Sequence, residues 1–222
     1  MNNSEFSKAE KAAVYRVIEA RRDVRKFCND PISDDILQRI LRAAAHAPSV
    51  GYMQPWNFLL LRDMATRKKI HEAFQIANDE AKELFSAEQK ERGKAYSKLK
   101  LEGILESALN ICITCDRARS GKIVLGRTCQ PDMDLYSTVC AVQNLWLAAR
   151  AEGVGVGWVS IIKAQDLIDI LQLPENVVPI AYLCVGYTDK FADEPELKTA
   201  GWLPEIPFSE LIFYEKWEHS KS

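Results

Sequence analysis

The sequence predicts an α+β domain in which helices flank a mixed central sheet. Segments with helical and strand-like hydrophobic patterns alternate along the chain in the order α-α-β-α-β-α-β-α-β, and a long tail follows. The 222 residues suit one sizeable domain, and no repeat, low-complexity tract or linker divides them. Residues 1–222 are therefore expected to form a single domain.

The charge balance excludes several classes of function. Lysine and arginine together number 29 and the acidic residues 31, which gives a net charge of −2. No positive excess supports binding to nucleic acid or to an anionic membrane. No apolar run reaches the roughly 18–20 residues that a membrane helix needs, and the first residues lack the basic-then-apolar pattern of a signal peptide. We expect a cytoplasmic protein.

Two helices are predicted before the first strand. Ser7, with Glu10 three residues later, predicts the start of a helix that continues to about Ala20. Ser33 predicts the start of a second helix that ends at about Ala47.

The segment Arg21–Arg25, where the first helix ends, holds three arginines and one carboxylate. Its spacing fits solvated surface charge and an anion clamp equally well. In the clamp, guanidinium groups hold a phosphate or an electron-rich ring, and one acid is kept among them. The rest of the chain has to decide between these alternatives.

The middle of the chain begins with a loop, Pro48–Trp56, whose two prolines and one glycine break regular structure, so that it packs as a corner or lines a site. A strand is predicted at Asn57–Leu61, followed by a long charged helix from about Met64 to Lys90. The far end of this stretch is too polar for a core, so residues 78–100 are expected to protrude.

A second strand is predicted at about 109–115, followed by an irregular loop at 117–131. Asp132 or Asp134 then caps a helix that ends at about Ala151 and is apolar on nearly all sides. Such a helix must be covered all round, so we expect it to lie in the core and also to pack against a partner subunit.

Three glycines follow this helix. Gly153 suits the position just after a helix end, and Gly153, Gly155 and Gly157 alternate with valines as in a strand that another backbone approaches closely. The spacing is not a dinucleotide fingerprint, because these glycines follow a helix and do not link a strand to one. A short helix at 165–171 and a buried strand at 178–185 complete the predicted core.

Cysteines and histidines give little support for metal or redox chemistry. Cys112 and Cys115 have CxxC spacing, but they stand in a strand-like apolar run, where free thiols act as small hydrophobic groups. The three histidines are scattered, so no metal centre is predicted.

Four segments, at 21–25, 47–56, 132–151 and 153–160, together resemble the nitroreductase-like flavoprotein family. The resemblance extends from about residue 13 to 212. It is strongest to the flavin-fragmenting branch, to which the aspartate of Arg-Arg-Asp-Val-Arg and the sequence Gly-Trp-Val-Ser are particular. It implies a nitroreductase-like fold and a homodimer with FMN at the interface. A C-terminal arm at about 190–222 is expected to wrap the partner, and residues 78–100 become a candidate lid.

The activity implied by the resemblance consumes the flavin. Reduced FMN and O2 are converted to 5,6-dimethylbenzimidazole, the lower ligand of vitamin B12, and erythrose 4-phosphate is released. FMN is then a substrate, reduced by a separate flavin reductase or directly by NAD(P)H. Two alternatives stay open: a NAD(P)H-dependent nitroreductase or flavin reductase that recycles FMN, and a non-catalytic flavin carrier.

The resemblance also assigns the residues. Asp23 would act as general base or proton shuttle near the ribityl carbon, and Ser160 would orient the departing fragment near N5. Arg21 would bind the phosphate and Arg25 the N1/O2 edge, while Pro48–Val50 would reach the flavin from the partner subunit. The expected flavin contacts are Arg21, Arg22, Asp23, Val24, Arg25, Pro48, Ser49, Val50, Lys100, Gly157 and Ser160.

Simpler roles stay open for the two catalytic candidates, because Asp23 could only hold the clamp in shape and Ser160 could only end a strand. One departure bears on binding. Family members commonly carry basic residues after the Gly-Trp of the arm, near the phosphate, whereas here the sequence is Leu203-Pro204-Glu205. Arg21 and Arg22 are therefore expected to carry more of the phosphate binding.

Overall fold

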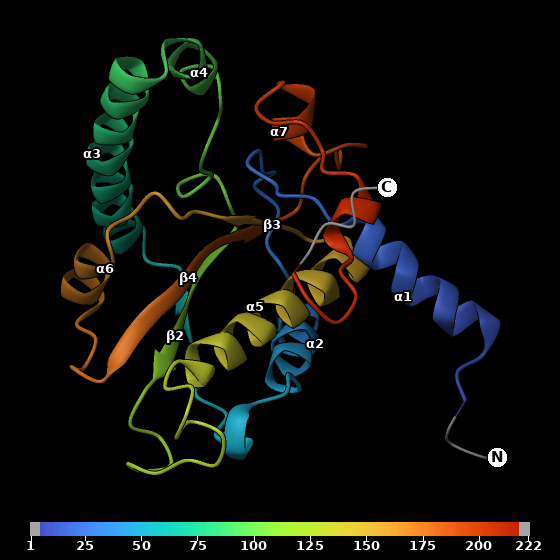
Figure 1. The fold of residues 1–222 in the computed structure, drawn as a ribbon. Helices are drawn as coiled ribbons and strands as arrows, with labels where there is room; N and C mark the ends of the chain where they lie inside the picture. The colour runs from blue at the N-terminus through green and yellow to red at the C-terminus, as the bar shows by residue number, and fades with distance from the viewer. Residues whose placement is uncertain (1–4, 218–222) are drawn as a thin grey trace.

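Four strands form one sheet on which the helices pack (Figure 1). The structure, a computed structural model, describes residues 5–217. The strands lie in the order β1-β2-β4-β3, and every neighbouring pair is antiparallel. Their bounds are β1 Trp56–Leu61, β2 Leu109–Asp116, β3 Gly155–Trp158 and β4 Val177–Gly186.

Five helices, α1, α2, α3, α5 and α6, fall close to the predicted segments, which confirms the α+β class, whereas α4 and α7 were not predicted. Their bounds are α1 Lys8–Ala20, α2 Asp34–Ala45, α3 Met64–Glu88, α4 Lys90–Tyr96, α5 Met133–Ala151, α6 Ala164–Leu171 and α7 Glu196–Thr199, with short 3-10 turns η1 Val50–Tyr52 and η2 Phe208–Leu211. Ser7 and Ser33 cap α1 and α2 as expected, and Ser7 forms a capping box with Glu10. Gly153 follows α5 with a φ of +75°.

The sheet separates two hydrophobic clusters, because successive side chains of a strand point to opposite faces. Figure 1 shows α2 and α5 on one side of the sheet and α3 and α6 on the other. Ile111 and Leu183 face α2 and α5, whereas Cys112 and Tyr182 face α3 and α6. Cys112 and Cys115 are both fully buried free thiols, and burial raises the pKa of Cys112 to about 12.

The sheet is antiparallel and not mixed as predicted, and within residues 5–217 parallel pairing is limited to one isolated bridge outside the strand pairs. It joins Asp23, in the extended segment after α1, to Val156 of β3. This bridge fastens the arginine-rich segment to the edge strand of the sheet, since β3 is last in the strand order. The candidate site is built around it.

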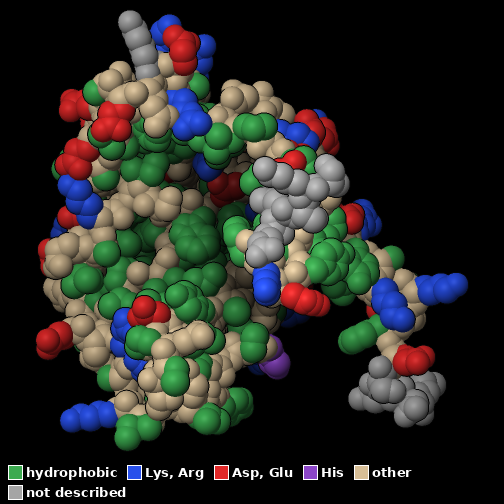
Figure 2. Space-filling model, viewed as in Figure 1, with side chains coloured by type: hydrophobic (Ala, Val, Ile, Leu, Met, Phe, Trp, Pro, Cys, Tyr) green, Lys and Arg blue, Asp and Glu red, His purple; other side chains and the backbone are tan. Residues whose placement is uncertain are grey.

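One face of α5 is not covered by the other described residues of the chain. Val142 and Leu145 are fully buried, but Tyr136 is 57% and Val139 42% exposed. Figure 2 shows hydrophobic side chains across the middle of the face along which α5 runs. The expectation of a helix covered on all sides therefore holds for only one of its faces in a single chain.

The protruding segment and the tail meet. The Phe85 ring of α3 lies 5.1 Å from the Tyr96 ring of α4 and 5.3 Å from that of Trp202 in the tail. Beyond this contact the tail exposes large apolar side chains, with Phe208 77% and Trp217 82% exposed. The lid and the wrapping arm stay predictions, and the arm's residues 218–222 lie outside the described residues. No helix within residues 5–217 is long and apolar enough to span a membrane.

Candidate active site

The site begins where the chain leaves α1 in an extended conformation. Backbone pairing with β3 holds this segment, since the Val24 amide donates to the Val156 carbonyl at 3.0 Å. The side chain of Asp23 takes part in the same junction, because the Trp158 amide donates to its Oδ1 at 3.0 Å. The carboxylate is therefore fixed by the edge strand of the sheet.

The glycines of β3 explain how the two backbones come so close. A Cβ atom on Gly157 would lie 2.1 Å from the Val24 carbonyl oxygen, and a Cβ on Gly155 would lie 3.0 Å from the Val24 side-chain methyls. Real Cβ atoms do not approach a backbone oxygen to 2.1 Å. The prediction of a closely approached glycine strand is confirmed for Gly155 and Gly157, although a Cβ on Gly153 would meet nothing within 4 Å, and the approaching segment carries Asp23.

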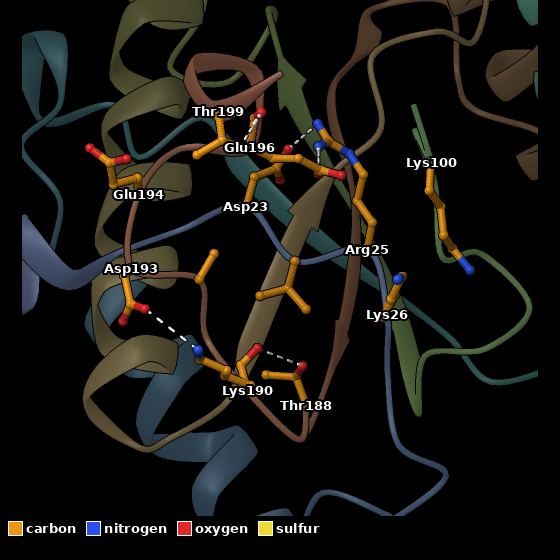
Figure 3. Close-up of a pocket in the computed structure, with 12 residues that line it drawn as sticks. Asp23, Arg25, Lys26, Lys100, Thr188, Lys190, Asp193, Glu194, Glu196 and Thr199 are labelled. Atoms are coloured by element: carbon orange, nitrogen blue, oxygen red, sulfur yellow. Dashed lines mark hydrogen bonds and ion pairs between the residues drawn. The ribbon is translucent and has the colours of Figure 1, made fainter. Parts of the chain in front are cut away.

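A chain of three charged groups extends from Asp23 into the cavity (Figure 3). Nη2 of Arg25 donates to Oδ2 of Asp23, and Nη1 of Arg25 donates to Oε2 of Glu196 in α7 at 2.9 Å. The side chain of Arg25 is 14% exposed, that of Asp23 27% and that of Glu196 47%. The exposed fraction of the side chain therefore rises from Arg25 to Glu196, which lies at the solvent end of the group.

Burial raises the pKa of Asp23 above the ordinary aspartate value. The Arg25 guanidinium and the Trp158 amide act in the opposite direction, but the loss of water around the carboxylate outweighs them. A carboxylate with a raised pKa in a cavity can accept and return a proton closer to neutral pH than a free aspartate can. Acid-base chemistry therefore suits Asp23.

The cavity beside this group has a volume of about 550 Å³, within the usual range of sites for small organic molecules. Its lining is strongly charged and comes from the 23–26 segment, Lys100 and the 188–199 segment. The lining residues are Asp23, Val24, Arg25, Lys26, Lys100, Thr188, Lys190, Ala192, Asp193, Glu194, Glu196 and Thr199. Lys100 stands across Arg25 from Asp23 (Figure 3) and pairs with Glu106.

Comparison with known proteins decides the family. The model of the nitroreductase family matches residues 18–187, most of the chain. The chain belongs to the nitroreductase family.

Some of its relatives in sequence carry a more specific name. The chain is 42% identical over 187 residues to the 5,6-dimethylbenzimidazole synthase of Rhodospirillum rubrum, covering 84% of this chain and 87% of that protein. A protein of the same name from Rhodobacter capsulatus is 34% identical over 202 residues, covering 91% of this chain and 96% of that one.

Solved structures share the fold at lower identity. Nitroreductase A from Vibrio parahaemolyticus aligns with a TM-score of 0.67 and 19% identity, covering 93% of this chain and 77% of that one. A nitroreductase-like family protein from Bacillus cereus aligns with a TM-score of 0.63 and 23% identity, covering 95% and 97%. The predicted nitroreductase-like fold is confirmed.

In this nitroreductase-family chain, the two arginines before Asp23 do not line the cavity beside it. The Arg21 guanidinium lies 4.7 Å from the centre of the Trp146 ring. Arg22 donates to the backbone carbonyls of Glu19, Arg21 and Asp193, and its buried Nε has no partner within residues 5–217. Arg22 lines a neighbouring cavity of about 570 Å³, which also contains Lys198 and Glu205.

Ser160 does not line the cavity of Asp23. It is exposed in the connection between β3 and α6, and it lines a smaller cavity of about 200 Å³. Gly157 lies one residue before Trp158, whose amide holds Asp23. The structure therefore brings Gly157 to Asp23 but leaves Ser160 to one side.

The loop Pro48–Val50 lies near the other end of α5. The Val50 amide donates to Ser137 Oγ in the first half of that helix at 3.0 Å, whereas Trp146 Nε1 donates to the Arg22 carbonyl at 3.3 Å. Nine residues of helix separate those two contacts, a rise of about 13 Å. One chain does not bring this loop to its own Asp23.

Sequence reasoning missed Glu196. It stands 171 residues from Arg25 along the chain, in a tail predicted only as an arm. Pro195 before an acidic residue is a local sign of a helix start, and α7 does begin there. No local sign connects this glutamate to the arginine cluster.

Proposed function

We propose that this protein is a 5,6-dimethylbenzimidazole synthase, which converts reduced FMN and O2 to 5,6-dimethylbenzimidazole and erythrose 4-phosphate. The names of the two curated relatives support the activity. The observation that carries the proposal is the partly buried carboxylate of Asp23, held by the Trp158 amide beside a cavity that can take a small organic molecule. Recycling a flavin requires hydride and electron transfer, whereas dismantling its ribityl chain requires proton transfers at carbon and oxygen, for which a carboxylate is suited.

The residues present fit FMN. Arg25 and Lys100 provide cations at the cavity wall, where the pyrimidine edge of a reduced flavin carries negative charge. Arg21 and Arg22 would provide guanidinium groups for a phosphate outside this cavity, and the buried Nε of Arg22 has no hydrogen-bond partner within residues 5–217. Glu205 provides no cation for the phosphate, and its carboxylate is paired with Nζ of Lys198 at 2.8 Å.

When it is bound, reduced FMN supplies the electrons that react with oxygen. Arg25 orients the pyrimidine edge with those N–H groups that it does not donate to Asp23 and Glu196. Asp23 takes a proton on one of its carboxylate oxygens and returns it, which its raised pKa favours. Ser160 would have to approach from its neighbouring cavity to orient the departing fragment, so its role depends on movement of the β3–α6 connection.

A homodimer completes the proposed site. The loop Pro48–Val50 does not reach Asp23 within one chain, which supports its delivery by a second copy. The uncovered face of α5 and the apolar tail supply hydrophobic surface for such an interface, with Tyr136, Val139 and Trp217 all exposed. Electrons would come from a separate flavin reductase or from NAD(P)H directly.

The test is incubation of the protein with excess reduced FMN in air, followed by mass spectrometry for 5,6-dimethylbenzimidazole. Formation of the product by the wild type is the expected result, and its absence would overturn the proposal. Rapid NAD(P)H-dependent reduction of nitroaromatics without the product would identify a nitroreductase or flavin reductase. Binding of FMN with neither activity would identify a flavin carrier.

A further inference from the structure

We propose that Glu196 is a positioning residue. It holds the Arg25 guanidinium from the side away from Asp23, so that Arg25 forms ion pairs with two carboxylates and not with Asp23 only. The inference rests on the proposed function for its chemical purpose. The sharing of the Arg25 guanidinium between Asp23 and Glu196 is seen directly in the geometry of the described residues.

The guanidinium of Arg25 is divided between two carboxylates. Nη2 donates to Asp23 and Nη1 donates to Glu196 at 2.9 Å, so each terminal nitrogen has its own acid. Two contacts fix both the position and the plane of a guanidinium, which leaves its remaining N–H groups in a defined direction. Glu196 therefore determines how Arg25 faces the cavity.

The glutamate is itself held in place. Pro195 precedes it at the start of α7, and Lys198 in the same short helix binds Glu194 at 3.0 Å and Glu205 at 2.8 Å. Arg22 also donates to the carbonyl of Asp193 just before the helix. The Arg22–Asp193 hydrogen bond and the Arg25–Glu196 ion pair therefore both join the segment Arg21–Arg25 to α7 and the residues just before it.

Charge sharing affects how Asp23 titrates. Arg25 and Arg21 lower the pKa of Asp23, whereas burial and the negative charge of Glu196 raise it. Four further charged residues of the lining have ion-pair partners: Lys100 pairs with Glu106, Lys190 and Asp193 pair with each other, and Glu194 pairs with Lys198. Lys26 also lines the cavity. Glu196 is the acid of this lining that competes with Asp23 for Arg25, so removing its charge should strengthen the ion pair between Arg25 and Asp23.

The decisive variant is Glu196→Gln, with Glu194→Gln as the matched control. Both replace an acid of the same cavity wall by its isosteric amide, but Glu194 binds Lys198 and not Arg25. Glu196 is about half exposed, so the change does not disturb the core. The readout is the titration of the Asp23 carboxyl by NMR of ¹³C-labelled aspartate, assigned with Asp23→Asn, in protein without added FMN.

The expected result is that Glu196→Gln shifts the Asp23 titration to lower pH, while Glu194→Gln leaves it within error of the wild type. An unmoved titration in Glu196→Gln, or an equal shift in both variants, would overturn the proposal. Where the wild type forms 5,6-dimethylbenzimidazole, the limb of its pH–rate profile that Asp23 controls should move to lower pH in Glu196→Gln. Absence of product from the wild type would count against the proposed function, whereas the titration would still decide the role of Glu196.

Discussion

The contact between β3 and the segment 23–24 leaves no room for a side chain at Gly157. We predict that Gly157→Ala separates the two backbones, because the new Cβ would lie 2.1 Å from the Val24 carbonyl oxygen. A backbone oxygen cannot move aside as a flexible side chain can. The separation would break the bond from the Val24 amide to Val156 and the bond from the Trp158 amide to Asp23, both now 3.0 Å long.

The cost follows from those two bonds. A neutral backbone hydrogen bond contributes about 1 kcal/mol to stability, and one to a charged group about 1.5–3 kcal/mol. Retaining the bonds under compression costs a similar amount, because overpacking typically costs about 1–3 kcal/mol. We expect Gly157→Ala to lower the free energy of unfolding by about 2–4 kcal/mol, which in a chain of this size lowers Tm by roughly 4–16 °C.

Gly155 provides a matched control. A Cβ there would meet the Val24 side chain at 3.0 Å and not its backbone. In a Val24→Ala background, Gly155→Ala should therefore become less destabilising, because only the Cβ of residue 24, 3.1 Å away, then remains close, whereas Gly157→Ala should stay as destabilising as before. Urea unfolding of the single and double variants measures both effects, and fluorescence titration should show weaker FMN binding in Gly157→Ala. A loss below about 0.5 kcal/mol in Gly157→Ala, with unchanged FMN binding, would refute the reasoning.

Three further predictions concern buried polar groups. Arg67 is 3% exposed and donates to backbone carbonyls of the turn at 104–107, so Arg67→Met should cost about 2–4 kcal/mol in urea unfolding by stranding them; a neutral effect would contradict this. Ser137→Ala removes the acceptor of the Val50 amide and should cost about 1–2 kcal/mol, measured in the same way, while Asp23 titrates as before. Because the folded protein holds a proton on Asp23 more tightly than the unfolded chain does, wild-type stability should fall as pH rises from about 3.8, the ordinary aspartate value, through the raised pKa. Asp23→Asn should remove that fall in stability. Parallel pH-stability curves for the wild type and Asp23→Asn would contradict this prediction.

Local signals predicted the elements well. Ser7 and Ser33 identified the starts of α1 and α2 because a capping side chain binds amides only three residues away. The alternating glycines predicted a close backbone approach because no other residue permits it, and Gly157 shows the reason. The α+β class followed from the order of these segments.

The site depended on contacts that local patterns do not record. Arg25 and Glu196 are 171 residues apart in the chain, and their ion pair exists only because α7 folds back over the arginine segment. The sequence also could not indicate that Ser160 lines a cavity separate from that of Asp23. The loop Pro48–Val50 is a third case, because its predicted role requires a second chain.

The most direct test of the central claim measures reduced FMN lost and 5,6-dimethylbenzimidazole gained in the same aerobic reaction, for the wild type and for Asp23→Asn. The wild type should form the product as the flavin disappears. Asp23→Asn should bind FMN with an affinity within about twofold of the wild type and form no product, because its amide cannot carry the proton. Product formation that survives Asp23→Asn would contradict the role given to this carboxylate.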